Sequence, residues 1–203
     1  MKITIISGSH RNDSQSSKVA RHFQKTLLNS ICEEAPIIDL ANNPLPLWDQ
    51  GIWDGEEKWI ELLAPYKDIL TTSDAFVVIS PEWHGQVPAG LKNFFLIFGK
   101  NELAHKPAVI VAVSSSDGGA YPVAELRMSS YKNSRLCYIP ENIIIRHVES
   151  VLNEKLEDNN QSADTYFKER IEWSLNILKQ YAIALKLVRE SGVTTTDKFG
   201  NGM

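Results

Sequence analysis

Short, uninterrupted apolar runs recur along this chain and alternate with longer amphipathic stretches. A run of about five apolar residues is typical of a strand that is buried on both faces. These runs predict strands near residues 2–7, 36–40, 75–80 and 108–113, and a less regular fifth strand that pairs near residues 136–139 and continues as extended chain through 147.

Apolar residues at helical spacing predict a helix after most of these strands. The expected helices lie near residues 16–29, 56–70, 88–99 and 121–131, and a longer last helix has an apolar stripe from Phe167 to Val188. We expect Pro65 to bend or interrupt the second helix. We also expect a loop over residues 42–55, a polar and mobile stretch over 156–164, and a fraying tail over 191–203.

The alternation of buried strands and helices predicts an α/β fold with a parallel sheet covered on both faces. Five strands suit the flavodoxin-like, doubly wound order 2-1-3-4-5, with a switch point between strands 1 and 3. We expect residues 1–190 to form a single domain of this kind and residues 191–203 to form a flexible C-terminal tail.

Polar loops follow the first, third and fourth predicted strands, over residues 8–17, 81–88 and 114–119. Ligands of open α/β sheets bind at the carboxyl ends of the strands, close to the switch point. We therefore expect these three loops to converge on one binding site.

The loop after the first strand is dense in hydroxyl groups, contains Arg11 and ends where a helix begins. Backbone N–H groups at a helix start favour an anion, and hydroxyls and a guanidinium add hydrogen bonds to phosphate oxygens. The loop lacks the glycine patterns of dinucleotide sites and P-loops, so a single phosphate monoester fits best. The alternative is an ordinary loop with a serine N-cap, and the convergence of three loops favours phosphate.

Composition excludes several other classes of function. The net charge is −4, with 21 Lys and Arg dispersed among 25 Asp and Glu, which argues against a nucleic-acid surface. No apolar run approaches the roughly 20 residues that span a bilayer, so no membrane partner is expected. Cys32 and Cys137 are isolated, which predicts no metal site and favours a reduced, cytoplasmic protein over one with a single disulfide. No Gly-x-Ser-x-Gly elbow of a hydrolase is present.

The loop motifs match a known pattern. The stretch from Gly8 to Ser16 follows Gly-Ser-x-Arg-x-x-Ser-x-Asn, with Ser16 at the Asn position. The stretch from Pro81 to Asn93 follows Pro-Glu-Tyr-Asn-x-x-x-Pro-x-x-Leu-Lys-Asn, with Trp and His in place of Tyr and Asn. Over about residues 1–140 the chain resembles the NADPH-dependent FMN reductase family of flavodoxin-like flavoproteins, whose relatives include quinone, azo-dye and chromate reductases.

This resemblance implies FMN as the cofactor, NADPH or NADH as the electron donor, and a role for each loop. The expected phosphate ligands are Ser9, Arg11, Ser14 and Ser16, and we include the neighbouring Ser17 with them. The expected neighbours of the isoalloxazine ring and the ribityl chain are Pro81, Glu82, Trp83 and His84. The expected contacts at the far edge of the ring are Ser115, Asp117, Gly118 and Gly119.

The resemblance implies an enzyme that reduces a small-molecule acceptor by ping-pong two-electron transfer. The acceptor is a quinone, an azo compound, a free flavin or a metal oxyanion. No catalytic acid or base is required, and His84 is the candidate if one acts. The alternative function is a non-catalytic FMN-binding electron carrier or redox-responsive module, which the mild net charge disfavours.

The run from Phe94 to Phe98 is wider than one helix stripe. It is either fully buried in the core or part of a subunit interface, and we favour an interface in a homodimer or homotetramer. Trp48 and Trp53 lie in the loop after the second strand, where they either cover the site of a neighbouring subunit or anchor their own loop.

Overall fold

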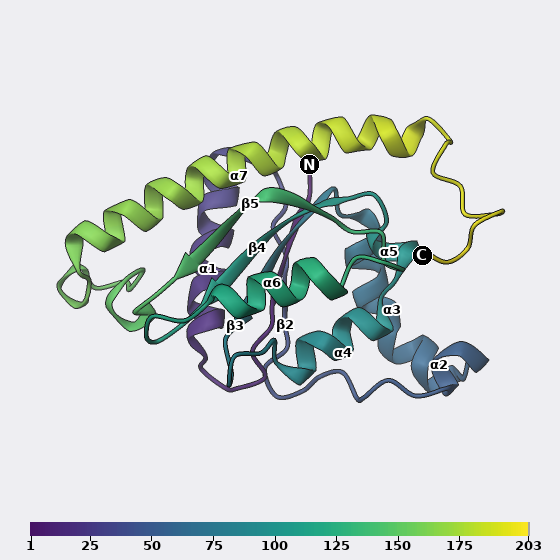
Figure 1. The fold of residues 1–203 in the computed structure, drawn as a ribbon, viewed down its shortest axis with the longest axis horizontal. Helices are drawn as coiled ribbons and strands as arrows, with labels where there is room; N and C mark the ends of the chain where they lie inside the picture. The colour runs from purple at the N-terminus through teal and green to yellow at the C-terminus, as the bar shows by residue number, and fades with distance from the viewer. Residues whose placement is uncertain (203) are drawn as a thin grey trace.

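The computed structural model describes residues 1–202 and has an α/β architecture (Figure 1). Its strands are β1 (Ile3–Ser7), β2 (Ile37–Asp39), β3 (Ala75–Pro81), β4 (Pro107–Val113) and β5 (Cys137–Ile145). Its α-helices are α1 (Gln15–Ser30), α2 (Gly51–Asp54), α3 (Glu57–Thr72), α4 (Ala89–Ile97), α5 (Lys100–Leu103), α6 (Ala120–Ser129) and α7 (Gln161–Glu190). Two 3₁₀ helices, η1 (Val148–Ser150) and η2 (Leu156–Asp158), precede α7.

The five strands form one parallel sheet in the order β2-β1-β3-β4-β5. This order confirms the flavodoxin-like, doubly wound fold. All strand-to-strand connections are therefore crossovers, and the carboxyl ends of the strands meet at one edge of the sheet.

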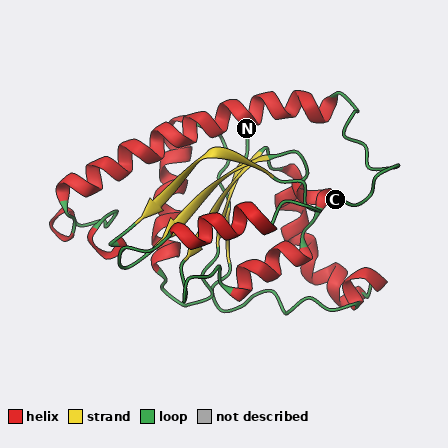
Figure 2. Cartoon of the chain, in the orientation of Figure 1, coloured by secondary structure: helices red, strands yellow, loops and turns green. Residues whose placement is uncertain are grey.

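Helices cover both faces of the sheet, as Figure 2 shows. Side chains such as Ile3, Ile5 and Val77 point into a core that includes residues of α1 and α7. Ile6 and Phe76 point the other way, into a core that includes residues of α3, α4 and α6. Burial on both faces explains why the strands are continuous apolar runs.

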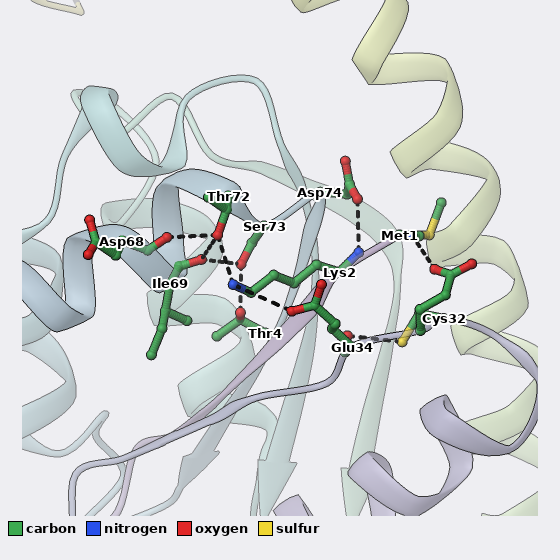
Figure 3. A network of polar contacts seen from close by, with 11 residues as sticks. Met1, Lys2, Thr4, Cys32, Glu34, Asp68, Ile69, Thr72, Ser73 and Asp74 are labelled. Atoms are coloured by element: carbon green, nitrogen blue, oxygen red, sulfur yellow. Dashed lines mark hydrogen bonds and ion pairs between the residues drawn. The ribbon is translucent and has the colours of Figure 1, made fainter.

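A polar network ties α3 to β1 at the amino edge of the sheet (Figure 3). Lys2 Nζ donates to Thr72 Oγ1 at 2.8 Å, and its backbone N–H donates to Asp74 Oδ2 at 2.9 Å. The hydroxyls of Thr4 and Ser73 lie 2.6 Å apart. These contacts fix the connection into β3 at the edge opposite the three polar loops.

Lys106 is buried near the same edge, with only 7% of its surface exposed. Its Nζ donates to the carbonyl oxygens of Leu70, Thr71 and Glu102, each at 2.8 Å. The ammonium thus joins the end of α3 to α5.

Two expectations about the first third of the fold need correction. Pro65 does not interrupt its helix, because α3 runs through it to Thr72, while a bend at Pro65 stays a prediction. Pro65 is exposed, so solvent can bond the carbonyl that it leaves without a backbone donor. The segment 42–55 is not entirely loop, since α2 forms within it and ends at Gly55 in the left-handed conformation.

The stretch 156–164 is more ordered than its polar sequence predicted. It contains η2 and the first turn of α7, whose N-cap Asn160 accepts a bond from the N–H of Ala163. Asp164 is 5% exposed and accepts from the N–H of Leu152 at 2.8 Å. Polar residues of the stretch 156–164 form hydrogen bonds within the chain, and the spacing of apolar residues in the sequence does not reveal such bonds.

The run from Phe94 to Phe98 packs mainly inside the chain itself. Phe94, Ile97 and Phe98 are buried in the core, Phe95 is half-buried, and Leu96 alone is well exposed. The preference for an interface was wrong for the three buried side chains, because α4 ends at Ile97 and the chain then turns Phe98 inward. Self-association stays a prediction, and this run gives it little support.

Trp48 and Trp53 contact each other edge to face at 4.7 Å in the segment before α3. The backbone N–H of Trp48 also donates to Asn93 Oδ1 at 2.8 Å. They anchor this loop, although Trp53 is largely exposed.

The last strand and the tail complete the fold. β5 is one strand through Ile145, with a register shift opposite β4 and with exposed Pro140 inside it. The tail after α7 turns back toward the body, where the N–H of Gly202 donates to Asn133 and Lys100 donates to the carbonyl of Gly200. Its flexibility stays a prediction. Among residues 1–202, no helix has the length and apolar character needed to cross a membrane.

Candidate functional site

The loop between β1 and α1 is tied to the sheet at one end and to the helix at the other. The N–H of Gly8 donates to the carbonyl of Ile79 on β3 at 2.8 Å. A side chain at Gly8 would place Cβ 2.6 Å from that oxygen and from Leu91, so only glycine fits. Ser14 is the N-cap of α1 and accepts from the N–H of Ser17.

Ser17 and Ser16 behave differently at this helix start. The Ser17 hydroxyl donates its single hydrogen to Asp39 Oδ2 at 2.7 Å and lies 2.9 Å from the Ser14 hydroxyl, so its donor is already used. Ser16 is only 1% exposed, and its buried hydroxyl has no hydrogen-bond partner within residues 1–202. A buried hydroxyl without a partner is costly, which points to a ligand at this helix start.

The remaining candidates of this loop, Ser9 and Arg11, lie before the start of α1. Ser9 is buried, and its hydroxyl accepts from the N–H of Arg11 at 3.3 Å. Arg11 is exposed. A long guanidinium at the rim of a helix start can reach an anion bound there.

The loop after β3 is a tight turn. Trp83 and Gln86 exchange two backbone hydrogen bonds of 3.1 and 2.9 Å around His84 and Gly85. Both central residues have positive φ, 50° and 70°, as in a two-residue hairpin turn of type I′. His84 is exposed at the tip and Trp83 is half-buried at the base.

Glu125 of α6 holds the end of this turn. Its carboxylate accepts from the N–H of Val87 at 2.7 Å and from Lys92 Nζ at 2.5 Å. Burial raises the pKa of Glu125, but these two hydrogen bonds outweigh burial and leave the pKa below its usual value. The turn is therefore braced from both α4 and α6.

Glu82 joins the loops after β3 and β4. Its N–H donates to the carbonyl of Val113 at 3.0 Å, and its Oε2 accepts from the N–H of Gly119 at 2.5 Å. Both the backbone and the carboxylate of Glu82 are therefore engaged in joining the two loops.

The two glycines after β4 sit in crowded surroundings. A Cβ on Gly118 would lie 2.8 Å from Glu82 Oε1, and one on Gly119 would lie 2.4 Å from Ile144 Cγ2. Gly119 also has a φ of 107°. Both positions allow a close approach of backbone that a side chain would prevent.

Ser115 and Asp117 are exposed on the side of this loop that faces β5. The Ser115 hydroxyl donates to Glu149 at 3.4 Å, and Asp117 Oδ1 lies 2.9 Å from His147 Nε2. Their side chains are thus engaged with residues after β5.

His10 is a site residue that sequence reasoning missed. Its ring meets Trp83 edge to face at 4.5 Å, and this contact brings the first and second loops together. Its Nδ1 is buried with no hydrogen-bond partner among residues 1–202, and a Cβ on Gly90 would lie 3.1 Å from it. The sequence feature that could have indicated His10 is its place in the hydroxyl-rich loop, at the x position of Gly-Ser-x-Arg, which the motif leaves unspecified.

The three loops therefore meet at the carboxyl edge of β1, β3 and β4. Ser9, Ser16 and Arg11 surround the start of α1, while Trp83 and the glycine pair lie farther along the edge. Within residues 1–202, no three His, Cys, Asp or Glu side chains come together as a metal site would require. The edge combines a hydroxyl-rich helix start with the aromatic side chain of Trp83.

Comparison with known proteins agrees with this arrangement. A family model described as NADPH-dependent FMN reductase matches residues 1–149. The chain is 25% identical over 147 residues to an NADPH azoreductase of Bacillus sp. (strain OY1-2), and the match covers 71% of this chain and 76% of that protein. It is 26% identical over 189 residues to a 2-hydroxy-1,4-benzoquinone reductase of Burkholderia sp., with 85% and 96% covered.

Solved structures share the fold. FerB, a flavoenzyme NAD(P)H:(acceptor) oxidoreductase from Paracoccus denitrificans, aligns with a TM-score of 0.68 at 21% identity over 90% of this chain and 97% of that chain. An FMN-dependent NADH-azoreductase from Bacillus anthracis str. Ames Ancestor, solved in complex with FMN, aligns with a TM-score of 0.58 at 15% identity over 88% and 100%. Because the family model spans most of the sequence and all three loops, this chain belongs to the NADPH-dependent FMN reductase family.

Proposed function

We propose that this protein is an FMN-dependent oxidoreductase that uses NAD(P)H to reduce a small quinone or azo compound by ping-pong two-electron transfer. Membership of the family supports FMN as the cofactor and a nicotinamide nucleotide as the electron donor. The choice of acceptor is supported by relatives named as azoreductase and quinone reductases. A free flavin and a metal oxyanion are the alternative acceptors. A cytoplasmic location fits the two free thiols of Cys32 and Cys137.

The residues at the sheet edge fit FMN. The observation that carries this assignment is the buried, unpartnered hydroxyl of Ser16 in the first turn of α1, where a phosphate monoester would accept its hydrogen. Ser9 and Arg11 would complete the phosphate site, and Ser14 and Ser17 would hold its shape.

The ring would lie between the turn after β3 and the glycine pair after β4. When bound, FMN supplies a centre that accepts a hydride from the nicotinamide and passes two electrons to the acceptor. Trp83 would form one wall, and the loop with Gly118 and Gly119, whose close packing depends on the absence of side chains there, would form another. His84 is at the exposed tip of the turn, and its role in proton transfer stays a prediction.

The function is tested on the purified protein. We expect the visible spectrum of a flavin, release of FMN rather than FAD on denaturation, and steady-state oxidation of NADPH with a benzoquinone or an azo dye as acceptor. Parallel double-reciprocal plots would support the ping-pong order. Bound FMN without turnover with either nucleotide would favour an electron carrier, and recovery of FAD alone would exclude the proposed phosphate site.

Arg11→Ala tests the phosphate site. We expect FMN binding to weaken by about 1.5–3 kcal/mol, or about 10–150-fold in Kd, because a charge-assisted hydrogen bond is lost. Flavin fluorescence titration of the apoprotein measures this. Lys25→Ala removes a positive charge from an exposed position on α1, the helix that follows this loop, and serves as the control. Equal affinities of Arg11→Ala and wild type would show that Arg11 points away from the phosphate.

A further inference from the structure

A cavity of about 730 Å³ lies beside the loop after β4, on the side away from β3. Its principal side chains are Arg146, His147, Ser150, Ser162, Tyr166 and Phe167. We propose that this cavity binds the adenosine end of NADPH and that Arg146 contacts the 2′-phosphate, which makes the enzyme selective for NADPH over NADH. The inference rests on the proposed function, since it locates the donor of that reaction.

The position of the cavity follows from the order of the strands. Along the carboxyl edge, the phosphate loop follows β1, the proposed ring position lies between the loops after β3 and β4, and Arg146 directly follows β5. In Figure 2 the strand arrows point toward the end of the molecule where α7 begins. A nucleotide whose nicotinamide reaches the ring can therefore extend its other end along the edge toward β5.

Arg146 is anchored to the same loop that would hold the ring. Its Nε donates to the carbonyl oxygens of Asp117 and Gly118 at 2.7 and 3.0 Å. The hydrogen bonds found for this side chain within residues 1–202 use Nε alone, so both terminal nitrogens are available to a ligand. A guanidinium held in this way is prepared to bind a phosphate with two parallel hydrogen bonds.

The electrostatics of the cavity favour an anion. No carboxylate is among its lining residues, and the carboxylate of Asp117, beside the cavity, is in contact with His147 at 2.9 Å. By contrast, a larger cavity of about 900 Å³ between α1 and α7 is lined by Glu154, Asp158, Glu169 and Glu172 as well as by basic residues. Within residues 1–202, Arg146 is bonded to backbone carbonyls rather than to a carboxylate, so the smaller cavity has a cation and no acid in its lining.

Aromatic surface completes the match to a nucleoside phosphate. Tyr166 is 60% exposed and lies edge to face against Phe167, with ring centroids 5.6 Å apart. An exposed aromatic ring offers a stacking face to a purine base. Ser162 supplies a further hydroxyl at the rim.

The first test measures binding directly. The FMN-loaded protein is titrated calorimetrically with adenosine 2′,5′-bisphosphate and with adenosine 5′-diphosphate, which lacks the 2′-phosphate. We expect at least about tenfold tighter binding of the 2′,5′ compound, and we expect Arg146→Ala to abolish the difference. Lys155→Ala, an exposed change in the same connection but outside the cavity lining, should leave it intact. Equal binding of the two compounds to wild type would overturn the inference.

The second test separates this inference from the proposed function. With a benzoquinone as acceptor, we expect Arg146→Ala to raise the KM for NADPH about 10–100-fold and to change kcat/KM for NADH less than about threefold. Arg146→Lys should recover part of the preference, because it keeps the charge but not the fork. If wild type oxidises NADPH and Arg146→Ala keeps its preference, only this inference fails. If wild type oxidises neither nucleotide, the proposed function fails, and the calorimetric comparison alone decides whether the cavity binds a 2′-phosphate.

Discussion

Replacing Gly119 with alanine is expected to lower the free energy of unfolding by about 2–4 kcal/mol and to abolish retention of FMN. Gly119 is buried with a φ of 107°, which strains any L side chain. An added Cβ would also lie 2.4 Å from Ile144 Cγ2 on β5. Relief of that overlap requires the loop to move, and the N–H bond to Glu82 would be lost with it.

Two other glycines separate the causes of this loss. Gly55 also has a positive φ, 70°, but has open space around its Cβ position, so Gly55→Ala measures conformational strain alone. Gly99 has a negative φ and open space, so Gly99→Ala should be nearly neutral. Urea unfolding of all three variants, with flavin content after purification, provides the comparison. A Gly119→Ala protein as stable as Gly55→Ala would mean that the predicted overlap is absorbed without cost.

Lys106→Met is the second large change that we expect, with a loss of about 2–4 kcal/mol of stability at pH 7. Methionine fills a similar volume but leaves the carbonyls of Leu70, Thr71 and Glu102 without the ammonium that bonds them. We expect the free energy lost with these hydrogen bonds to exceed the free energy gained by removing a buried charge. Lys186→Met, at an exposed position near the end of α7, is the matched control and should lie within about 0.5 kcal/mol of wild type.

The pH dependence provides a further check on Lys106. Burial lowers the pKa of Lys106 from its usual value of 10.5 to about 8, with a contribution from Arg189. Between these two pH values the unfolded chain binds more protons at this residue than the folded chain, so its contribution to stability rises with pH. We expect wild type to gain about 2–3 kcal/mol relative to Lys106→Met between pH 8 and pH 10. A constant difference across this range would mean that the ammonium is not destabilised by burial.

The sheet could be predicted from sequence because burial on both faces leaves an unmistakable pattern. The runs at residues 75–80 and 108–113 appear in the structure as β3 and β4, each about one residue longer. The packing of the helix after β3 was harder to predict. An apolar run does not indicate whether it packs against the same chain or against another subunit. Asp164 shows the same limit for polar residues, since a buried aspartate bonded to the N–H of Leu152 looks like a solvated one in the sequence.

The candidate site was predicted only as far as its motifs reach. The three loops follow from strand ends and helix starts, whereas Ser16 and the glycine pair were expected from the family resemblance. The contact of His10 with Trp83 and the carboxylate bridge from Glu82 to Gly119 join segments more than thirty residues apart. Such pairings depend on the register of the strands, which no local pattern specifies. The anchoring of Arg146, which we propose to contact the 2′-phosphate, was not expected for the same reason, because its partners lie on the loop after the preceding strand.

The hydrogen-bonded chain from Ser14 through Ser17 to Asp39 has a thermodynamic consequence. It ties the start of α1 to the end of β2 through contacts that need no ligand. A loop that is already ordered loses little conformational entropy when its ligand arrives. FMN exchange is then a docking event rather than a coupled folding reaction, so the protein should release and regain its cofactor repeatedly while the surrounding fold stays intact.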